Sequence, residues 1–182
     1  MNNIESKNNG TIRLNSKVMI SDPCYGLNTW CQGIIDNVLP GTYDCFVEYS
    51  DEGGWGTRVS AIEVRHICCD EVPRDFYPEN FEVGVDSGQA GIFDYEYYKK
   101  YHTDTKERNH VNDSWYDKVC NITLARNQAG TIDNFGFVSS SGYGDGGYTC
   151  WTARNSNEKV IAIRVEYITE DYDEYDYMEE EI

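Results

Sequence analysis

The length, composition and charge of the chain exclude several classes of protein. Its 182 residues suffice for one well-buried domain, and no segment approaches the roughly 20 apolar residues of a membrane-spanning helix. With 15 Lys and Arg residues against 32 Asp and Glu residues, the net charge of −17 repels nucleic acid and favours basic partners. The first residues lack the basic and apolar blocks of a secretory signal, which predicts a soluble protein of the cytoplasm.

The N-terminal half predicts a first strand and a hairpin. Residues 1–10 are polar, and we expect them to be disordered. A strand over 17–21 is stopped by the Asp-Pro pair that follows it, because proline cannot donate to a sheet ladder. Strands over 42–49 and 57–66 flank a Gly-Gly turn and predict a β-hairpin.

The middle of the chain predicts a connection, two short strands and a first helix. Residues 70–80 are acidic and interrupted by proline, which indicates a surface connection. Short strands over 81–86 and 89–93 follow. Asp94 is suited to cap a two-turn helix over 95–101.

A second helix is predicted after a polar loop. Ser114 is a candidate N-cap, and Trp115, Val119 and Ile122 recur at helical spacing. Gly130 stands where a C-terminal cap belongs. Between residues 99 and 126 the basic residues outnumber the acidic ones, unlike elsewhere in the chain.

The C-terminal region predicts the main hairpin. Strands over 148–153 and 160–168 flank a polar turn at 155–158, and the second strand alternates so that one face is apolar and the other mixed. The fold class is therefore a β-rich α+β domain over 11–169, with antiparallel sheets in a sandwich or roll and one or two short helices. An acidic tail over 170–182 is expected to be disordered.

Seven cysteines, an odd number, predict reduced and mostly buried thiols. Cys24, Cys31, His66, Cys68 and Cys69 could be drawn together as a metal site, but their spacings match no standard ligand set. We therefore expect no metal and no cofactor.

The acidic residues concentrate in the tail, which holds about half of the excess negative charge. The tail is either a solvated segment or an interaction strip, in which carboxylates imitate phosphates and tyrosine rings stack on arginine. The candidate partner-binding residues, from the tail and the 70–80 connection, are Glu170, Asp171, Asp173, Glu174, Asp176, Glu179, Glu180, Glu181, Asp70, Glu71, Asp75 and Glu79.

Four polar residues beside glycines admit a catalytic and a structural interpretation. Asp86, Ser87, Gln89 and Asp145 could supply a nucleophile and a general base, or they could form turns in which the carboxylates accept backbone N–H groups. The structural interpretation is favoured, because the contexts of the three histidines suggest no base. The sequence thus predicts turn-forming residues and no enzyme.

A small-ligand site is the main alternative to partner binding. Aromatic side chains in or near loops often line pockets; alternatively they form the core, since aromatic residues dominate the packing of β-sheets. The aromatic candidates are Tyr25, Trp30, Trp55, Tyr143, Tyr148 and Trp151. Direct nucleic-acid binding through the segment 99–126 is disfavoured by the overall charge.

Two short motifs carry a resemblance to a family. The run Val-Asp-Ser-Gly-Gln-Ala-Gly at 85–91 is followed, about fifty residues later, by Gly-Asp-Gly-Gly-Tyr at 144–148. In these motifs, and in 21–25 and 55–59, the chain resembles an uncharacterised bacterial and phage family with a Val-Asp-Ser-Gly-Gln signature. The resemblance covers residues 17 to 168 and implies a compact β-rich fold without an assigned activity.

The short length, the strong acidity and the Asn- and Tyr-rich composition are similar to those of phage-encoded type II anti-CRISPR proteins, which inhibit Cas9. This resemblance implies a DNA mimic, because Cas9-type enzymes read duplex DNA with arginines and hold the heteroduplex in a positive channel. We therefore expect an inhibitor of a Cas9–guide-RNA complex, or of another basic nucleic-acid-handling protein, in the bacterial cytoplasm. A small-ligand-binding module remains the alternative, and a homodimer remains open.

Overall fold

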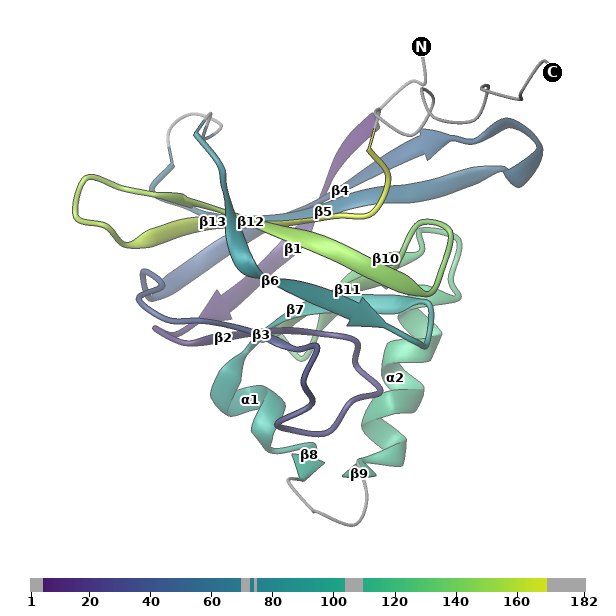
Figure 1. Cartoon of the computed structure of the whole chain (residues 1–182), viewed down its shortest axis with the longest axis horizontal. Helices are drawn as coiled ribbons and strands as arrows, with labels where there is room; N and C mark the ends of the chain where they lie inside the picture. Colours follow the sequence, from purple (N-terminus) through teal and green to yellow (C-terminus); the bar gives the residue numbers. More distant parts are fainter. Residues whose placement is uncertain (1–4, 70–72, 74, 104–109, 170–182) are drawn as a thin grey trace, which may run out of the picture.

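The structure, a computed structural model, describes residues 5–69, 73, 75–103 and 110–169 and consists mainly of two antiparallel sheets (Figure 1). The six-stranded sheet contains, in spatial order, β1 (Glu5–Leu14), β4 (Gly41–Asp51), β5 (Thr57–His66), β13 (Val160–Glu166), β12 (Gly146–Arg154) and β6 (Tyr77–Val85). The five-stranded sheet contains β10 (Ala129–Ile132), β11 (Gly136–Ser140), β7 (Gln89–Asp94), β2 (Val18–Ser21) and β3 (Gly33–Ile35).

The helical elements are short. They comprise α1 (Tyr95–Lys99), α2 (Asp113–Thr123) and the 3-10 turn η1 (Gly53–Trp55), and a small ribbon pairs β8 (His102–Thr103) with β9 (His110–Val111). In Figure 1 the two helices lie below the five-stranded sheet, and the six-stranded sheet lies above it. Within the described residues, neither helix has the length and apolar character needed to cross a membrane.

Two hydrophobic cores separate the three layers. The first contains inward side chains of both sheets, among them Val18 and Ile20 of β2 and Val64 of β5. The second lies between the five-stranded sheet and the helices, where Met19 of β2 packs near Trp115 of α2. Because successive side chains of a strand point to opposite faces, β2 is buried on both sides, and every one of its residues is buried.

The β-rich fold class with two antiparallel sheets and two short helices is confirmed. β5 has the predicted bounds, and the predicted hairpins correspond to β4–β5 and β12–β13. Asp94 caps α1 as predicted, since its carboxylate accepts a hydrogen bond from the Tyr97 N–H.

The expectation of disorder over 1–10 is wrong for residues 5–10. These residues begin β1, in which Ser6 pairs with Glu48 and Lys7 with Val47 of β4. Their side chains are mostly exposed and polar, so that backbone pairing rather than side-chain burial orders the segment. Composition alone therefore does not detect this strand.

Other boundaries differ from the predictions; α1, for example, ends at Lys99 and not at residue 101. β6 begins at Tyr77, inside the segment expected to be a connection, because its backbone pairs with β12. The N-cap of α2 is Asn112, whose side-chain oxygen accepts from the Trp115 N–H at 3.0 Å, and not Ser114. The helix ends at Thr123, and Gly130 instead lies in β10, where it pairs with Val138 of β11. The predicted tail over 170–182 lies outside the described residues.

Candidate functional site

The turn between β6 and β7 is organised by the buried carboxylate of Asp22. Oδ1 accepts hydrogen bonds from the Cys24 N–H at 2.8 Å and the Ser87 hydroxyl at 2.6 Å. Oδ2 accepts from the backbone N–H groups of Asp86 at 2.9 Å and Ser87 at 2.7 Å. A carboxylate offers about four lone-pair sites, and these donors occupy all of them. Asp22 therefore positions the turn, and its geometry does not suit a general base.

Ser87 and Gln89 connect this turn to helix α2. The Gln89 amide donates to Ser87 Oγ at 3.2 Å and to the Tyr116 hydroxyl at 3.1 Å. The Thr123 hydroxyl donates to Gln89 Oε1 at 2.7 Å. These hydrogen bonds join the turn and the start of β7 to one side of α2. They are the kind of contact that the structural interpretation of the sequence expects of Ser87 and Gln89.

Asp145 and Asp86 act differently from each other. Asp145 Oδ1 accepts from the Gly88 N–H at 3.0 Å, which is the turn-forming role predicted for it. Asp86 instead accepts from the Tyr25 hydroxyl at 2.6 Å, and the backbone N–H groups expected to bind an aspartate here bind Asp22. The sequence analysis missed Asp22 and used its Asp-Pro pair only as the end of a strand.

The thiol of Cys24 lies beside this carboxylate but is not activated. Burial is the main cause that raises its pKa, and the charge of Asp22 raises it further. A cysteine nucleophile requires the opposite shift, because the reactive species is the thiolate. In this geometry Cys24 stays a neutral thiol.

Loop 22–25 is held from below by aromatic side chains of the helical layer. The Tyr98 hydroxyl donates to the Tyr25 carbonyl at 2.7 Å, and His102 Nε2 lies 3.1 Å from the Pro23 carbonyl. The rings of Tyr98 and His102 stack with centroids 3.5 Å apart. Burial lowers the pKa of His102, although the carbonyls of Tyr98 and Pro23 oppose this shift. The ring of His102 therefore packs loop 22–25 onto the helical layer.

A recess of about 280 Å³ opens beside the turn, between Ser87, Gln89 and the side of α2. Tyr116, Cys120 and Leu124 contribute to its wall. None of the six predicted aromatic candidates lines it. Trp30, Trp55 and Tyr143 are exposed, whereas Tyr25, Tyr148 and Trp151 are half-buried.

Exposed carboxylates line the pair of strands β6 and β12. We name this surface the acidic edge and define it by Asp75, Glu79, Glu82, Asp86 and Asp145. All but the half-buried Glu79 are exposed. Glu82 lies opposite Thr149 of β12, and its carboxylate fills the space where a Cβ at position 147 would stand. β6 is the last strand of its sheet, and its Gly84 N–H donates to the Cys31 carbonyl of the loop before β3 at 3.1 Å.

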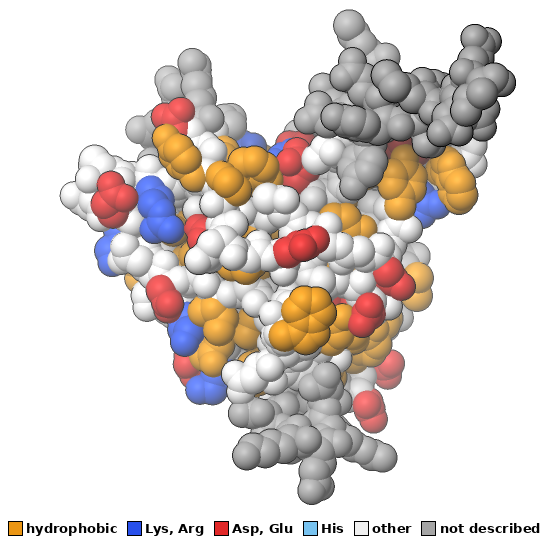
Figure 2. All heavy atoms as spheres, viewed as in Figure 1, with side chains coloured by type: hydrophobic (Ala, Val, Ile, Leu, Met, Phe, Trp, Pro, Cys, Tyr) orange, Lys and Arg blue, Asp and Glu red, His pale blue; other side chains and the backbone are white. Residues whose placement is uncertain are grey.

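In the described part of the chain, the segments that form this edge contain no Lys or Arg before Arg154. Lys and Arg do not occur in 18–57, 75–98 or 127–153, the stretches that supply loop 22–32, β6, the β6–β7 turn and the first part of β12. Arg154, at the far end of β12, lies 3.4 Å from Glu79. In Figure 2 most blue side chains lie on the left, where red and orange ones also occur, whereas the right, where β6 ends, shows mainly red and orange side chains.

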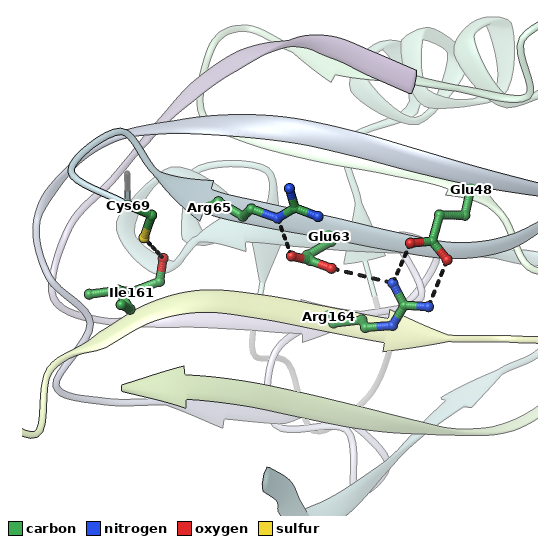
Figure 3. Close-up of polar contacts among 6 residues, drawn as sticks. All are labelled: Glu48, Glu63, Arg65, Cys69, Ile161 and Arg164. Atoms are coloured by element: carbon green, nitrogen blue, oxygen red, sulfur yellow. Dashed lines mark hydrogen bonds and ion pairs between the residues drawn. The ribbon is translucent and has the colours of Figure 1, made fainter. Parts of the chain in front are cut away.

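Other acidic residues of the same sheet are neutralised. Arg164 binds both oxygens of Glu48, at 2.8 and 2.7 Å, and lies 3.3 Å from Glu63, which also pairs with Arg65 (Figure 3). These side chains form a half-buried ladder across β4, β5 and β13. Because each carboxylate has a guanidinium partner, the ladder stabilises the sheet and adds little to the surface potential.

The acidic edge contains only part of the predicted partner-binding set. Asp75 is exposed and precedes β6 in the sequence. Glu79 lies within β6, and its carboxylate also accepts from the Thr152 hydroxyl at 2.6 Å. Glu82, Asp86 and Asp145 extend this group, although the sequence analysis did not assign them to partner binding. The remaining predicted residues, Asp70, Glu71 and the acidic residues of 170–182, lie outside the described residues.

Comparison with known proteins identifies a family. A family model described as "Protein of unknown function (DUF4241)" matches residues 13–165. No curated protein and no solved structure matches the chain.

Proposed function

We propose a function for this chain, which belongs to the DUF4241 family, from its surface: it binds a basic nucleic-acid-handling protein and blocks that protein's access to DNA. The observation that carries the proposal is the acidic edge, where exposed carboxylates stand on and beside two paired strands whose described residues contain no Lys or Arg before Arg154. Arg74, which precedes Asp75 in the sequence, lies outside the described residues. A surface of one sign raises the rate of encounter with a partner of the opposite sign.

The proposal involves no chemistry by the chain itself. Asp22 and Ser87 form their hydrogen bonds with each other and with groups around the β6–β7 turn. The neighbouring Cys24 is a neutral thiol. A rigid turn of this kind is suited to holding Asp86 and Asp145 at fixed positions on the surface. The carboxylates would then occupy the place of DNA phosphates on the partner.

The partner that we propose to test first is a Cas9–guide-RNA complex in the cytoplasm of a bacterial host. Its choice rests on the sequence resemblance to type II anti-CRISPR proteins and on the positive channel of Cas9-type enzymes. The more general proposal, a basic partner of the acidic edge, rests on the described residues alone.

The acidic edge predicts that two neutral substitutions weaken binding. We expect the double variant Asp75→Asn, Glu82→Gln to bind a purified Cas9–guide-RNA complex about 5- to 10-fold more weakly at low salt, mainly through a slower association rate. Surface plasmon resonance measures both rates. Neither carboxylate has a hydrogen bond or ion pair that holds the fold within the described contacts, so the melting temperature should stay within a few degrees.

The matched control is the double variant Asp36→Asn, Asp117→Asn. It changes the net charge by the same amount on two exposed carboxylates outside the edge, one after β3 and one on α2. Equal weakening by both double variants would show that overall charge, and not the acidic edge, governs binding. A chain ending at residue 169 measures the additional contribution of the acidic tail.

Binding of a small ligand is a second candidate, favoured by the recess beside Gln89. Its volume of about 280 Å³ lies near the lower end of ligand sites, and its mainly apolar lining with a few polar groups, such as those of Ser87 and Gln89, suits a small neutral molecule. A thermal-shift screen separates the two functions. A metabolite that raises the melting temperature, with no response to a basic protein, would favour this second function.

A further inference from the structure

An exposed aromatic pair lies at the tip of the β4–β5 hairpin, which extends beyond the body of the two sheets (Figure 1). Trp55 is 70% exposed and Tyr143, from the turn between β11 and β12, is 57% exposed. Their ring centroids are 6.4 Å apart with an interplanar angle of 80°, an edge-to-face arrangement. The two rings thus join two turns that are distant in sequence.

The tip is held in one conformation by its own backbone. Gly53 and Gly56 have φ values of +58° and +75°, which favour glycine, and the Glu52 N–H donates to the Gly56 carbonyl at 3.1 Å. Arg58 Nε donates to the Trp55 carbonyl at 3.0 Å. The exposed indole therefore stands on an ordered turn, so that little conformational entropy is lost when a partner covers it.

A carboxylate is fixed against the aromatic pair. Glu52 accepts hydrogen bonds from the Tyr143 and Ser50 hydroxyls, and these two bonds lower the pKa of Glu52. The side chain is therefore ionised at neutral pH. The neighbouring Asp51 is exposed and accepts from the Gly53 N–H at 3.0 Å. Negative charge and aromatic surface thus occur together.

We propose that Trp55, Tyr143 and Glu52 form an anchor for an arginine side chain of the partner; this rests on the proposed function, because it assumes a basic partner. A guanidinium stacks on an indole by a cation–π contact while it donates to a carboxylate, and lysine cannot do both in the same plane. Trp and Tyr at the centre of an interface commonly dominate its binding energy.

The anchor is continuous with the acidic edge. Tyr143 and Asp145 belong to the same turn, and Asp145 accepts from the N–H of Gly88, which follows Asp86 by two residues. A partner segment that lies along β6 would therefore reach Trp55 after passing this turn. The acidic edge supplies attraction over distance, and the anchor supplies a short-range contact that recognises arginine.

The test uses the full chain with 15N-labelled tryptophan and a peptide that is neutral at both ends, acetyl-(Arg-Gly)4-amide. The indole N–H signal of Trp55 is assigned by its loss in Trp55→Phe. We expect this signal to shift saturably with the arginine peptide, and to shift with at least 3-fold weaker affinity with the matching lysine peptide. Glu52→Gln should weaken the arginine effect about 2- to 10-fold.

Trp30 provides the control, because it is 93% exposed and lies in the β2–β3 loop. Trp55→Ala should weaken binding of the proposed protein partner about 2- to 30-fold, and Trp30→Ala should not. An unshifted Trp55 signal, or equal affinities for the arginine and lysine peptides, would overturn the anchor. If the partner still binds, and the double variant Asp75→Asn, Glu82→Gln still weakens that binding, the proposed function stands without the anchor. Loss of both responses removes both proposals.

Discussion

Asp22→Ala is expected to lower the free energy of unfolding by about 3–5 kcal/mol. The substitution leaves four donors around the β6–β7 turn without their acceptor: two groups of Ser87 and the backbone N–H groups of Cys24 and Asp86. Each unsatisfied buried donor costs about 1–3 kcal/mol, and part-exposed donors recover some of this from water. Urea unfolding followed by far-UV circular dichroism measures the change.

Two variants of the same turn give a graded comparison. Ser87→Ala removes one hydrogen-bond donor to Asp22 and should lower the free energy of unfolding by about 1–2 kcal/mol. Asp145→Ala removes the exposed carboxylate that accepts from the Gly88 N–H and should lower it by about 1 kcal/mol or less. If Asp22→Ala costs no more than Asp145→Ala, then Asp22 does not organise the turn.

Trp115→Ala is expected to destabilise the chain by about 3–5 kcal/mol, as for other large-to-small substitutions of buried aromatic residues. Trp115 is 1% exposed and packs against Phe93, Tyr98 and Tyr101 at ring-centroid distances between 5.6 and 6.0 Å. Its removal opens a cavity between α2 and the five-stranded sheet. The same urea titration applies.

Trp115→Phe separates packing from hydrogen bonding. It keeps most of the buried surface but removes the indole N–H, which donates to the Tyr97 hydroxyl at 2.7 Å, and it should cost about 1–2 kcal/mol. Trp30→Ala, at an exposed site, should change stability by less than about 0.5 kcal/mol. A Trp115→Ala variant as stable as Trp30→Ala would contradict the assignment of this second core.

The elements that the sequence predicts well are those specified locally. The bounds of β5 follow from a β-branched run after a glycine turn, and the start of α1 follows from one capping side chain, Asp94. β1 escapes prediction because its first residues are polar and depend on hydrogen bonds with β4. Its order comes from a neighbour that lies tens of residues away.

The candidate site depends on such distant contacts to a greater extent. Asp22 meets Asp86 and Ser87 across 64 and 65 residues, and Asp145 meets Gly88 across 57. Turn chemistry predicts that these residues bind backbone groups, but it does not identify which partner each one binds. The acidic composition of 70–80 likewise predicts Asp75 and Glu79 as partner-binding residues. The remaining carboxylates of the acidic edge are found only from the pairing of β6 with β12.

A competition experiment tests the central claim most directly. Duplex target DNA with a fluorescent label is bound to a Cas9–guide-RNA complex at two salt concentrations, and the chain is added. The account predicts that the chain displaces or excludes the DNA, that its apparent affinity falls steeply with salt, and that the Asp75→Asn, Glu82→Gln variant competes less well. DNA that stays bound at every concentration of the chain, or competition unaffected by salt and by these substitutions, would contradict it.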